Sequence, residues 1–471
     1  MIRMIVRRIM IPQVLAALLA VTSILAAACE GNKVPIPPAN APKTDVLSEG
    51  RTVHPDTGLW DEAGSRGEAG PRGEAGPRGV AYSQGANDDR VLIANSAATS
   101  GLRAEVGILI NAGLEAYLRM VNASGGIDRR RIIFTHNNDD QFDPVKGREA
   151  LRGMVEDEAV FAIVAHFGTP VVAATVGALK QYGIPAIFPI SGINELYATD
   201  AKTNGTGYNL FPVQPTFRTE GRIMVGYAAG VFKAKTIGIV YTGDEAGEGM
   251  FRGIIEQTAA LPQVRAVIRR LPTGIADTGN LEAKAALTAA VGALKQENPD
   301  YIIIASLLYS LPAIIGELAA QGLHQDCITS YANTSKSVSD AVLQIAGDDF
   351  AVYGLGWIDM HDTQALGLFD RWIEPEYSLN LYSMNGWIAA HFFCEGLRRI
   401  EGEDITWANY MAAMERAPID IPFGGSCDFS GGKRWGTREM NLLRAIPASP
   451  DFPTGWEEVS PMNNVNTLLG R

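Results

Sequence analysis

Strands and helices alternate along residues 91–197, and this alternation constrains the fold more than any other feature of the chain. A short apolar run at residues 91–95 precedes a small-residue turn and a long pattern in which apolar side chains recur every three or four residues, which is typical of a helix. Further strand-like runs follow at residues 131–136, 160–164 and 185–189. Strands that alternate with helices at this spacing predict a parallel sheet with helices on both faces.

Small hydroxyl residues stand at three of the predicted strand ends, in or beside glycine turns. They are Ser100 with Gly101, Thr169, and Ser191 with Gly192. Ligands of parallel sheets bind at the carboxyl ends of the strands, where helix N-termini present unpaired N–H groups. We therefore predict a binding site at this edge. The alternative for each hydroxyl is a helix cap without any contact to a ligand.

Two larger side chains, His166 and Phe167, lie in the turn that precedes Thr169. We expect Phe167 to line the site. A lone histidine after an apolar strand is more often structural, so we expect His166 to belong to the core.

Composition excludes several classes of function. The chain has 471 residues, of which 46% are hydrophobic and 20% charged, so two or more globular domains are expected. The net charge of −12 argues against nucleic acid as a partner, and it also fits simple solubility. No phosphate-binding loop, zinc-protease motif or nucleophile elbow is present, and the pair Asp359-x-His361 alone is weak evidence for a metal. We predict a protein that is not an enzyme and needs no cofactor.

The amino terminus has the pattern of an export signal. Three arginines precede a mostly apolar stretch at residues 9–25, and Ala-Ala-Ala then precedes Cys29. This ending resembles the lipobox of bacterial lipoproteins, which predicts a signal peptide at residues 1–28 and a lipidated Cys29 that anchors an exported protein to a bacterial membrane. A retained transmembrane anchor and plain secretion are the alternatives. The export route, general or twin-arginine, stays open.

Residues 29–88 have no hydrophobic period and are rich in proline, glycine and charge. From Gly64 the chain contains five consecutive Gly-x-y triplets, the repeat that a collagen triple helix requires. Since five triplets are few, we predict a tether on a monomeric protein and keep a trimeric stalk as the alternative.

A second strand–helix unit follows. Strands are expected at residues 235–241, 264–270, 301–305 and 326–330, with helical patterns between them. Two such lobes joined by several chain crossings would enclose a cleft that can hinge.

Six stretches, in order, resemble the leucine/isoleucine/valine-binding family of type I periplasmic binding proteins, the substrate-binding components of amino-acid ABC transporters. They are residues 118–128 (LRMVNASGGID), 138–144 (NDDQFDP), 162–170 (AIVAHFGTP), 183–196 (GIPAIFPISGINEL), 237–249 (IGIVYTGDEAGEG) and 298–304 (NPDYIII). The resemblance implies an α/β fold of two doubly wound, Rossmann-like lobes joined by three crossings, near residues 212–217, 354–358 and 421–426. Lobe 1 would comprise residues 89–214 and 356–422, and lobe 2 residues 215–355 and 423–471.

The resemblance also implies how a ligand is held. Thr169 falls where the family binds the ligand's carboxylate, and Ser191 and Gly192 fall where backbone and hydroxyl groups add to it. In lobe 2 the family's tyrosine is replaced by Ala246, and a strand-end aromatic maps near Leu307 or Leu308, with Tyr309 close by.

The family acid that pairs with the ligand's ammonium falls at Tyr331, although Asp244 or Glu245 could supply a carboxylate instead. An amino acid, an amine-free or aromatic carboxylate and an amide are therefore all possible ligands.

The resemblance implies an ABC permease as partner. A sensory lipoprotein of the same fold is the alternative, and a structural surface protein without a ligand is a third possibility. The family's disulfide has no counterpart here, and we expect Cys394 and Cys427 to form the pair if any pair is oxidised.

Overall fold

The computed structural model describes residues 80–101, 103–135, 138–204, 207–308, 310–449 and 452–470. All of these residues belong to one compact unit. The predicted signal peptide, Cys29 and the collagen-like triplets lie outside the described residues. None of the described helices has the length and apolar character needed to cross a membrane.

The first sheet has five parallel strands in the order β2-β1-β3-β4-β5, which agrees with the predicted alternation. Its central strand β3 is fully buried, as expected for a sheet covered on both faces. The strands are β1 (Arg90–Ala94), β2 (Arg131–Thr135), β3 (Ala162–Val164), β4 (Ala186–Ile187) and β5 (Leu210–Phe211).

The helices around this sheet come from two distant parts of the chain. They are α2 (Ala104–Ala123), α3 (Pro144–Arg152) with η2 (Gly153–Asp157), α4 (Thr169–Tyr182), η3 (Asn194–Leu196), α5 (Ala201–Asn204), α11 (Thr363–Asp370), η6 (Pro375–Tyr377), α12 (Leu381–Arg398) and α13 (Trp407–Met414).

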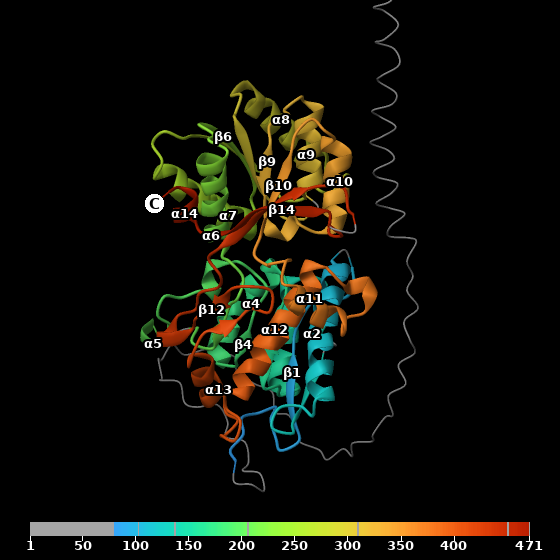
Figure 1. Cartoon of the computed structure of the whole chain (residues 1–471), viewed down its shortest axis with the longest axis vertical. Helices are drawn as coiled ribbons and strands as arrows, with labels where there is room; N and C mark the ends of the chain where they lie inside the picture. Colours follow the sequence, from blue (N-terminus) through green and yellow to red (C-terminus); the bar gives the residue numbers. More distant parts are fainter. Residues whose placement is uncertain are drawn as a thin grey trace, which may run out of the picture. The chain divides into compact units, whose positions relative to one another are not determined.

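Helices α2 and α12 lie side by side in Figure 1 and have the most extensive contact between any two described elements. Glycine on each helix permits this close packing. A Cβ on Gly113 would lie 1.7 Å from the carbonyl oxygen of Ser383, and one on Gly386 would lie 1.9 Å from that of Ile110. A side chain at either position would therefore force the helices apart.

The second sheet has seven strands in the order β14-β13-β10-β9-β8-β6-β7. The run from β10 to β7 is parallel, whereas β13 and β14 join its edge as antiparallel strands. The strands are β6 (Thr236–Thr242), β7 (Arg265–Leu271), β8 (Tyr301–Ala305), β9 (Cys327–Thr329), β10 (Val352–Gly356), β13 (Met440–Ala445) and β14 (Trp456–Asn463). Strands β6 to β9 match the four predicted ranges within one residue at each end, and the antiparallel pair was not predicted.

The helices beside the second sheet are largely amphipathic, and all except α6 and η4 follow one of its strands. They are α6 (Phe217–Val225) with η4 (Gly226–Val231), α7 (Glu245–Ala259), α8 (Leu281–Gln296), α9 (Ser310–Ala320), η5 (Tyr331–Asn333), α10 (Lys336–Ala346) and α14 (Val465–Leu468). Helix α7 begins at a cap in which Oδ1 of Asp244 accepts a hydrogen bond of 2.8 Å from the amide of Gly247.

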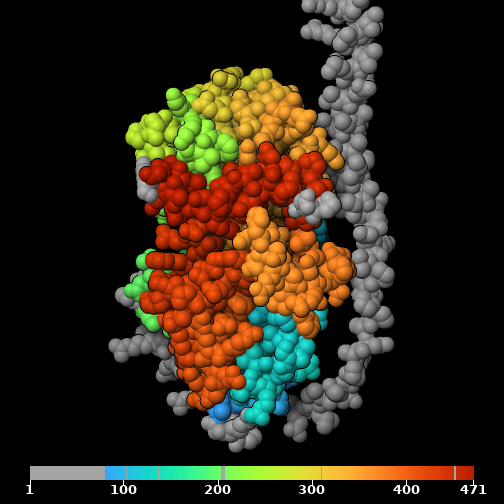
Figure 2. Space-filling view, in the orientation of Figure 1, coloured from blue at the N-terminus to red at the C-terminus, as the bar shows by residue number. Residues whose placement is uncertain are grey.

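The chain passes between the two sheets three times: after β5, after β10, and in the stretch that precedes β13. This last stretch includes the small sheet of β11 (Ile419–Asp420) and β12 (Ser426–Cys427), followed by η7 (Ser430–Gly432). The C-terminal residues then form a continuous red band on the surface seen in Figure 2, next to the green segment of α6 and η4.

Residues 423–434 pack with the first sheet. The ring of Phe429 lies 5.3 Å from that of Phe211, and the guanidinium of Arg434 lies 4.4 Å from the same ring. We therefore keep the predicted lobe ranges as a proposal, except that these contacts favour a start of the last lobe 2 segment after residue 434.

Candidate functional site

Thr169 and Ser191 lie together at the carboxyl ends of β3 and β4. The hydroxyl of Ser191 donates a hydrogen bond of 3.1 Å to Oγ1 of Thr169, the first residue of α4. No side-chain hydrogen bond caps the N-terminus of this helix. The hydroxyl pair is therefore not occupied by capping, and it stands beside backbone N–H groups that favour an anion.

Gly192 connects this pair to the start of α6. The amide of Phe217 donates a hydrogen bond of 2.9 Å to the carbonyl oxygen of Gly192, and a Cβ on Gly192 would lie 2.8 Å from that same amide nitrogen. Glycine is therefore needed at this position for packing, whatever its contact with a ligand.

Phe167 is buried next to the hydroxyl pair. Its backbone pairs with Ile190 in a parallel bridge, and its ring contacts those of Phe142 and Tyr382, with centroids 5.7 and 6.5 Å away. The residue therefore forms an apolar wall between the first sheet and α12.

Ser100 and Gly101 are held by a different set of contacts. The amide of Ser100 donates to Oδ1 of Asp139 at 3.2 Å, its hydroxyl donates to Oδ2 at 2.5 Å, and Gln141 donates to that hydroxyl at 3.1 Å. Burial alone would raise the pKa of Asp139, but these hydrogen bonds outweigh it and lower the pKa. These hydrogen bonds organise the turn and do not connect it to Thr169 or Ser191.

His166 is fully buried, as expected of a structural histidine. Its Nδ1 lies 3.2 Å from the carbonyl oxygen of Ser96 and its Nε2 lies 2.8 Å from Oγ1 of Thr175. Burial lowers the pKa of the imidazole to about 4, so the ring is neutral at pH 7 and forms part of the core below the strand ends.

The three predicted site residues of lobe 2 lie in different surroundings from one another. Ala246 is buried in the first turn of α7 and offers only a methyl group, and Leu307 is half-buried directly after β8. Tyr331 is buried at the end of β9, and its hydroxyl accepts a hydrogen bond of 2.6 Å from Nε2 of Gln214, in the first connection between the sheets. Tyr331 thus links that connection to the second sheet.

A carboxyl group from a different element lies beside Tyr331. Glu220, on α6, is fully buried, and its Oε1 accepts a hydrogen bond of 2.8 Å from the amide of Tyr331. Burial raises the pKa of this carboxyl to about 8, so the neutral form prevails at pH 7. Glu220 was not predicted from the sequence, although its spacing with Phe217 and Met224 on the buried face of α6 was a usable signal.

Several buried polar atoms of this region have no hydrogen-bond partner among the described residues. They are Oε2 of Glu220, Oε1 of Gln214, Oγ1 of Thr242 and Oγ of Ser306. Thr242 is the last residue of β6 and Ser306 follows β8, so two of them mark carboxyl ends of parallel strands. Buried polar groups are normally paired, so this edge has capacity to bind a polar ligand or water.

Two cavities of about 380 and 340 Å³ lie elsewhere, and they share Thr219, Arg222 and Arg438 in their linings. Neither lining includes Thr169 or Ser191. We place the candidate site at the strand ends because the hydroxyl pair of Thr169 and Ser191, the N-terminus of α4 and the unpaired buried atoms lie along the edges where parallel sheets bind ligands.

The pair that we expected if any cysteines were oxidised, Cys394 and Cys427, does not form a disulfide in this structure. Cys394 and Cys427 are both buried and free, as is Cys327. Cys427 directs its Sγ to the carbonyl oxygen of Val213 at 3.7 Å, whereas Cys394 lies within α12, among the apolar residues that α12 buries. Burial raises the pKa of both thiols to about 12, which keeps them protonated.

Comparison with known proteins agrees with this architecture. The profile of a family described as periplasmic binding protein matches residues 91–449. Leu/Ile/Val-binding protein homolog 1 of Brucella abortus (strain 2308) is 26% identical over 306 residues, which cover 62% of this chain and 75% of that protein.

Solved structures share the fold. The fatty acid ABC transporter substrate-binding protein from Thermomonospora curvata superposes with a TM-score of 0.70 at 18% identity, over 84% of this chain and 98% of that one. A solute-binding protein of an ABC transporter from R. palustris, in complex with benzoate, gives 0.63 at 20% identity, over 80% and 98%. The matched residues and the two sheets of mostly parallel strands lead to one conclusion: this chain belongs to the type I periplasmic binding proteins of the leucine/isoleucine/valine-binding family.

Proposed function

We propose that this protein is the extracytoplasmic solute-binding component of an ABC transporter, and that it binds a small carboxylate between its two lobes and delivers it to a membrane permease. The observation that carries the proposal is the hydroxyl pair of Thr169 and Ser191 at the N-terminus of α4. Two hydroxyls and the backbone amides of a helix start can bind a carboxylate without a cationic side chain.

The ligand need not be an amino acid. A family acid is expected at the position of Tyr331, and the nearby carboxyl of Glu220 is neutral at pH 7 because of its pKa of about 8. A neutral carboxyl gives an ammonium group no ion pair. Amine-free carboxylates are therefore the preferred class of ligand. Both classes occur among the similar proteins, since one is named for leucine, isoleucine and valine, one is named for fatty acid, and one is in complex with benzoate.

Export and anchoring belong to the same proposal. A signal peptide at residues 1–28 and a lipidated Cys29 would hold the protein at a bacterial membrane, with residues 29–88 as the tether. We propose a monomer, because one pair of lobes supplies both sides of the cleft. A sensory role for the same fold is the second candidate, and dependence of solute uptake on this protein would distinguish transport from sensing.

Thermal unfolding of the purified protein tests the proposal against a panel of amino acids, amine-free aliphatic and aromatic carboxylates, and amides. A ligand at 100 times its dissociation constant adds about 2.7 kcal/mol to the free energy of unfolding, which is a measurable shift in Tm. Shifts with carboxylates, and none with the matching amides, are expected. Shifts confined to amides, or no shift with any member, would contradict a carboxylate site.

A further inference from the structure

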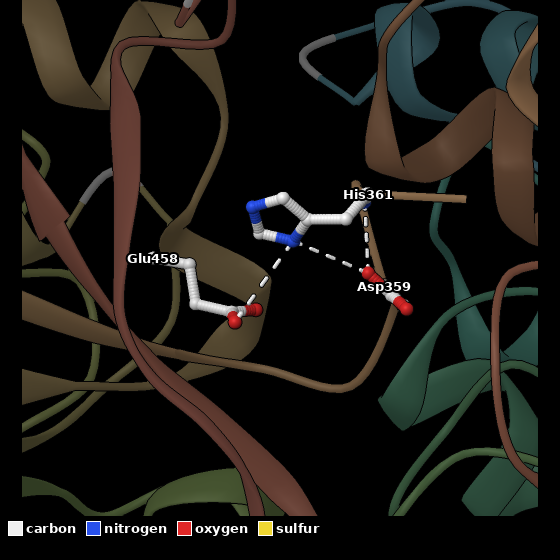
Figure 3. Close-up of side chains that lie close together, drawn as sticks. All are labelled: Asp359, His361 and Glu458. Carbon is white, nitrogen blue, oxygen red and sulfur yellow. Dashed lines mark hydrogen bonds and ion pairs between the residues drawn. The ribbon is translucent and has the colours of Figure 1, made fainter. Parts of the chain in front are cut away.

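Three side chains from two separate segments converge near the second connection between the sheets. Asp359 and His361 follow β10, and Glu458 lies on β14 (Figure 3). Nδ1 of His361 lies 3.3 Å from Oδ1 of Asp359 and 3.9 Å from Oε1 of Glu458. One ligand atom from each residue lies within 4.8 Å of the other two.

Hydrogen bonds fix the two carboxylates in these positions. Nδ2 of Asn441, a buried residue on β13, donates to Oε2 of Glu458 at 2.6 Å and leaves Oε1 directed to the histidine. The amide of His361 donates to Oδ1 of Asp359 at 2.8 Å, and the amide of Asp359 donates to the carbonyl oxygen of Phe423 at 2.7 Å. Partners of this kind orient metal ligands and raise metal affinity.

We propose that Asp359, His361 and Glu458 form a binding site for a divalent transition-metal cation, with Zn²⁺ the best match. One imidazole nitrogen and two carboxylate oxygens are a ligand set that Zn²⁺ accepts. Tetrahedral Zn²⁺ with bonds of about 2.0–2.1 Å requires ligand atoms about 3.3–3.4 Å apart. The His361–Asp359 separation of 3.3 Å meets this requirement, whereas the His361–Glu458 separation of 3.9 Å exceeds it by about 0.5 Å, so Oε1 of Glu458 has to move toward the histidine when the cation binds.

Exposure and charge support the same assignment. The side chain of His361 is 66% exposed, so a cation can enter and keep water in its remaining position. Two carboxylates and a neutral imidazole provide two negative charges, which balance those of the cation. Because Asp359 also contacts Phe423 in the third connection, a bound cation would tie two connections to the edge strand β14.

Simple attraction between a histidine and acidic neighbours is the alternative, and the chain offers a matched example. His324 and Asp349 form such a pair, with Nδ1 and Oδ2 3.7 Å apart, and no third ligand is grouped with them among the described residues. The substitution His324→Ala therefore controls for the loss of an exposed histidine beside one carboxylate.

Titration calorimetry tests the site on protein that is purified without a polyhistidine tag and treated with EDTA. Zn²⁺ should bind with one equivalent to the unsubstituted protein and to the His324→Ala variant. Binding should weaken at least tenfold in His361→Ala and in Glu458→Gln, and Co²⁺ should give a visible absorption band that the same two variants lose. No saturable binding, or equal binding by the His361→Ala and His324→Ala variants, would overturn the proposal. The binding of Zn²⁺ and its loss in these variants do not depend on the solute bound at Thr169, so failure of this proposal would be distinguishable from failure of the proposed function.

Discussion

The amide of Tyr331 donates a hydrogen bond of 2.8 Å to a buried oxygen of Glu220, across 111 residues of sequence. Tyr331 occupies the position at which the family resemblance places an acid, so a carboxyl group is present there after all, supplied by α6. Because this carboxyl is buried and neutral at pH 7, it stabilises the end of β9 and offers no negative charge to a ligand.

Glu220 should make the protein less stable as pH rises. Its pKa is about 8 in the folded protein and 4.5 in the unfolded chain, so the folded state binds more protons between these values. The contribution of this carboxyl to the free energy of unfolding is then fully present below pH 4.5 and decreases toward pH 8, by up to about 1.4 kcal/mol for each unit of pKa difference.

Glu220→Gln keeps an acceptor for Tyr331 and should flatten this decrease when unfolding is measured from pH 5 to 9. Glu256→Gln, at an exposed carboxylate paired with Arg218, is the control. Parallel curves for Glu220→Gln and the unsubstituted protein would contradict the assignment.

His166 should act in the opposite direction. Burial lowers its pKa from 6.5 to about 4, so below pH 6.5 the unfolded chain binds a proton that the folded protein excludes. This contribution to stability is present above pH 6.5 and is lost as pH falls toward 4, and it amounts to about 3 kcal/mol in total.

His166→Asn can keep the hydrogen bond to Ser96 without a titrating ring. The variant should be less stable at pH 7 and should lose less stability on acidification, as measured by urea unfolding at pH 7 and pH 5. An equal loss in both proteins would refute a buried neutral histidine.

Two helical glycines, Gly113 in the contact of α2 with α12 and Gly177 on an open face of α4, should respond oppositely to substitution by alanine. Gly113→Ala places a methyl group 1.7 Å from the carbonyl oxygen of Ser383, and we expect it to destabilise the protein by about 1–3 kcal/mol or more. Gly177, on an exposed face of α4, has no atom within 4 Å of its added Cβ. Gly177→Ala should therefore stabilise by about 0.5–1 kcal/mol. Denaturant unfolding measures both, and similar effects of the two substitutions would contradict the packing.

Much of the fold could be predicted from the sequence because buried parallel strands and amphipathic helices have strong periodic patterns. The run at residues 301–305 is apolar throughout, and it forms β8 with every residue buried. The pair β13 and β14 could not be predicted in this way. β14 is an edge strand that contains Pro461, and its pairing with β13 has register shifts, so its pattern alternates irregularly.

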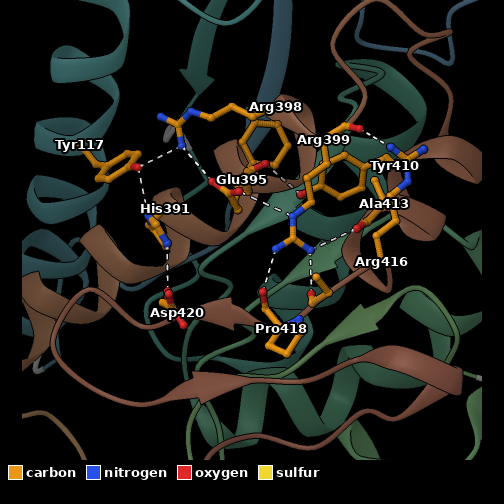
Figure 4. A network of polar contacts seen from close by, with 12 residues as sticks. Tyr117, His391, Glu395, Arg398, Arg399, Tyr410, Ala413, Arg416, Pro418 and Asp420 are labelled. Carbon is orange, nitrogen blue, oxygen red and sulfur yellow. Dashed lines mark hydrogen bonds and ion pairs between the residues drawn. The ribbon is translucent and has the colours of Figure 1, made fainter.

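Contacts between distant segments were beyond the sequence pattern, and α12 illustrates this (Figure 4). Arg399, which follows this helix, donates hydrogen bonds of 2.8 Å to the carbonyl oxygens of Ala417 and Pro418, and Nε2 of His391 lies 3.0 Å from that of Asp420. These side chains position the third connection, yet their sequence pattern is that of ordinary surface residues.

The candidate site was predictable in part for the same reason. The hydroxyls at Thr169 and Ser191 follow strands and could be found from local pattern. Glu220 comes from a helix that precedes the second sheet, and only the fold brings it to Tyr331.

The central claim is that Thr169 and Ser191 bind the carboxylate of the ligand, and calorimetric titration with the best carboxylate of the panel tests it most directly. Thr169→Ala combined with Ser191→Ala should weaken binding at least tenfold, because each lost hydrogen bond to a charged group is worth about 1.5–3 kcal/mol. Thr406→Ala removes a hydroxyl that caps α13 through the amide of Asn409, so it should lower stability and leave affinity unchanged. Unchanged affinity in the double variant, or an equal loss in Thr406→Ala, would contradict the account.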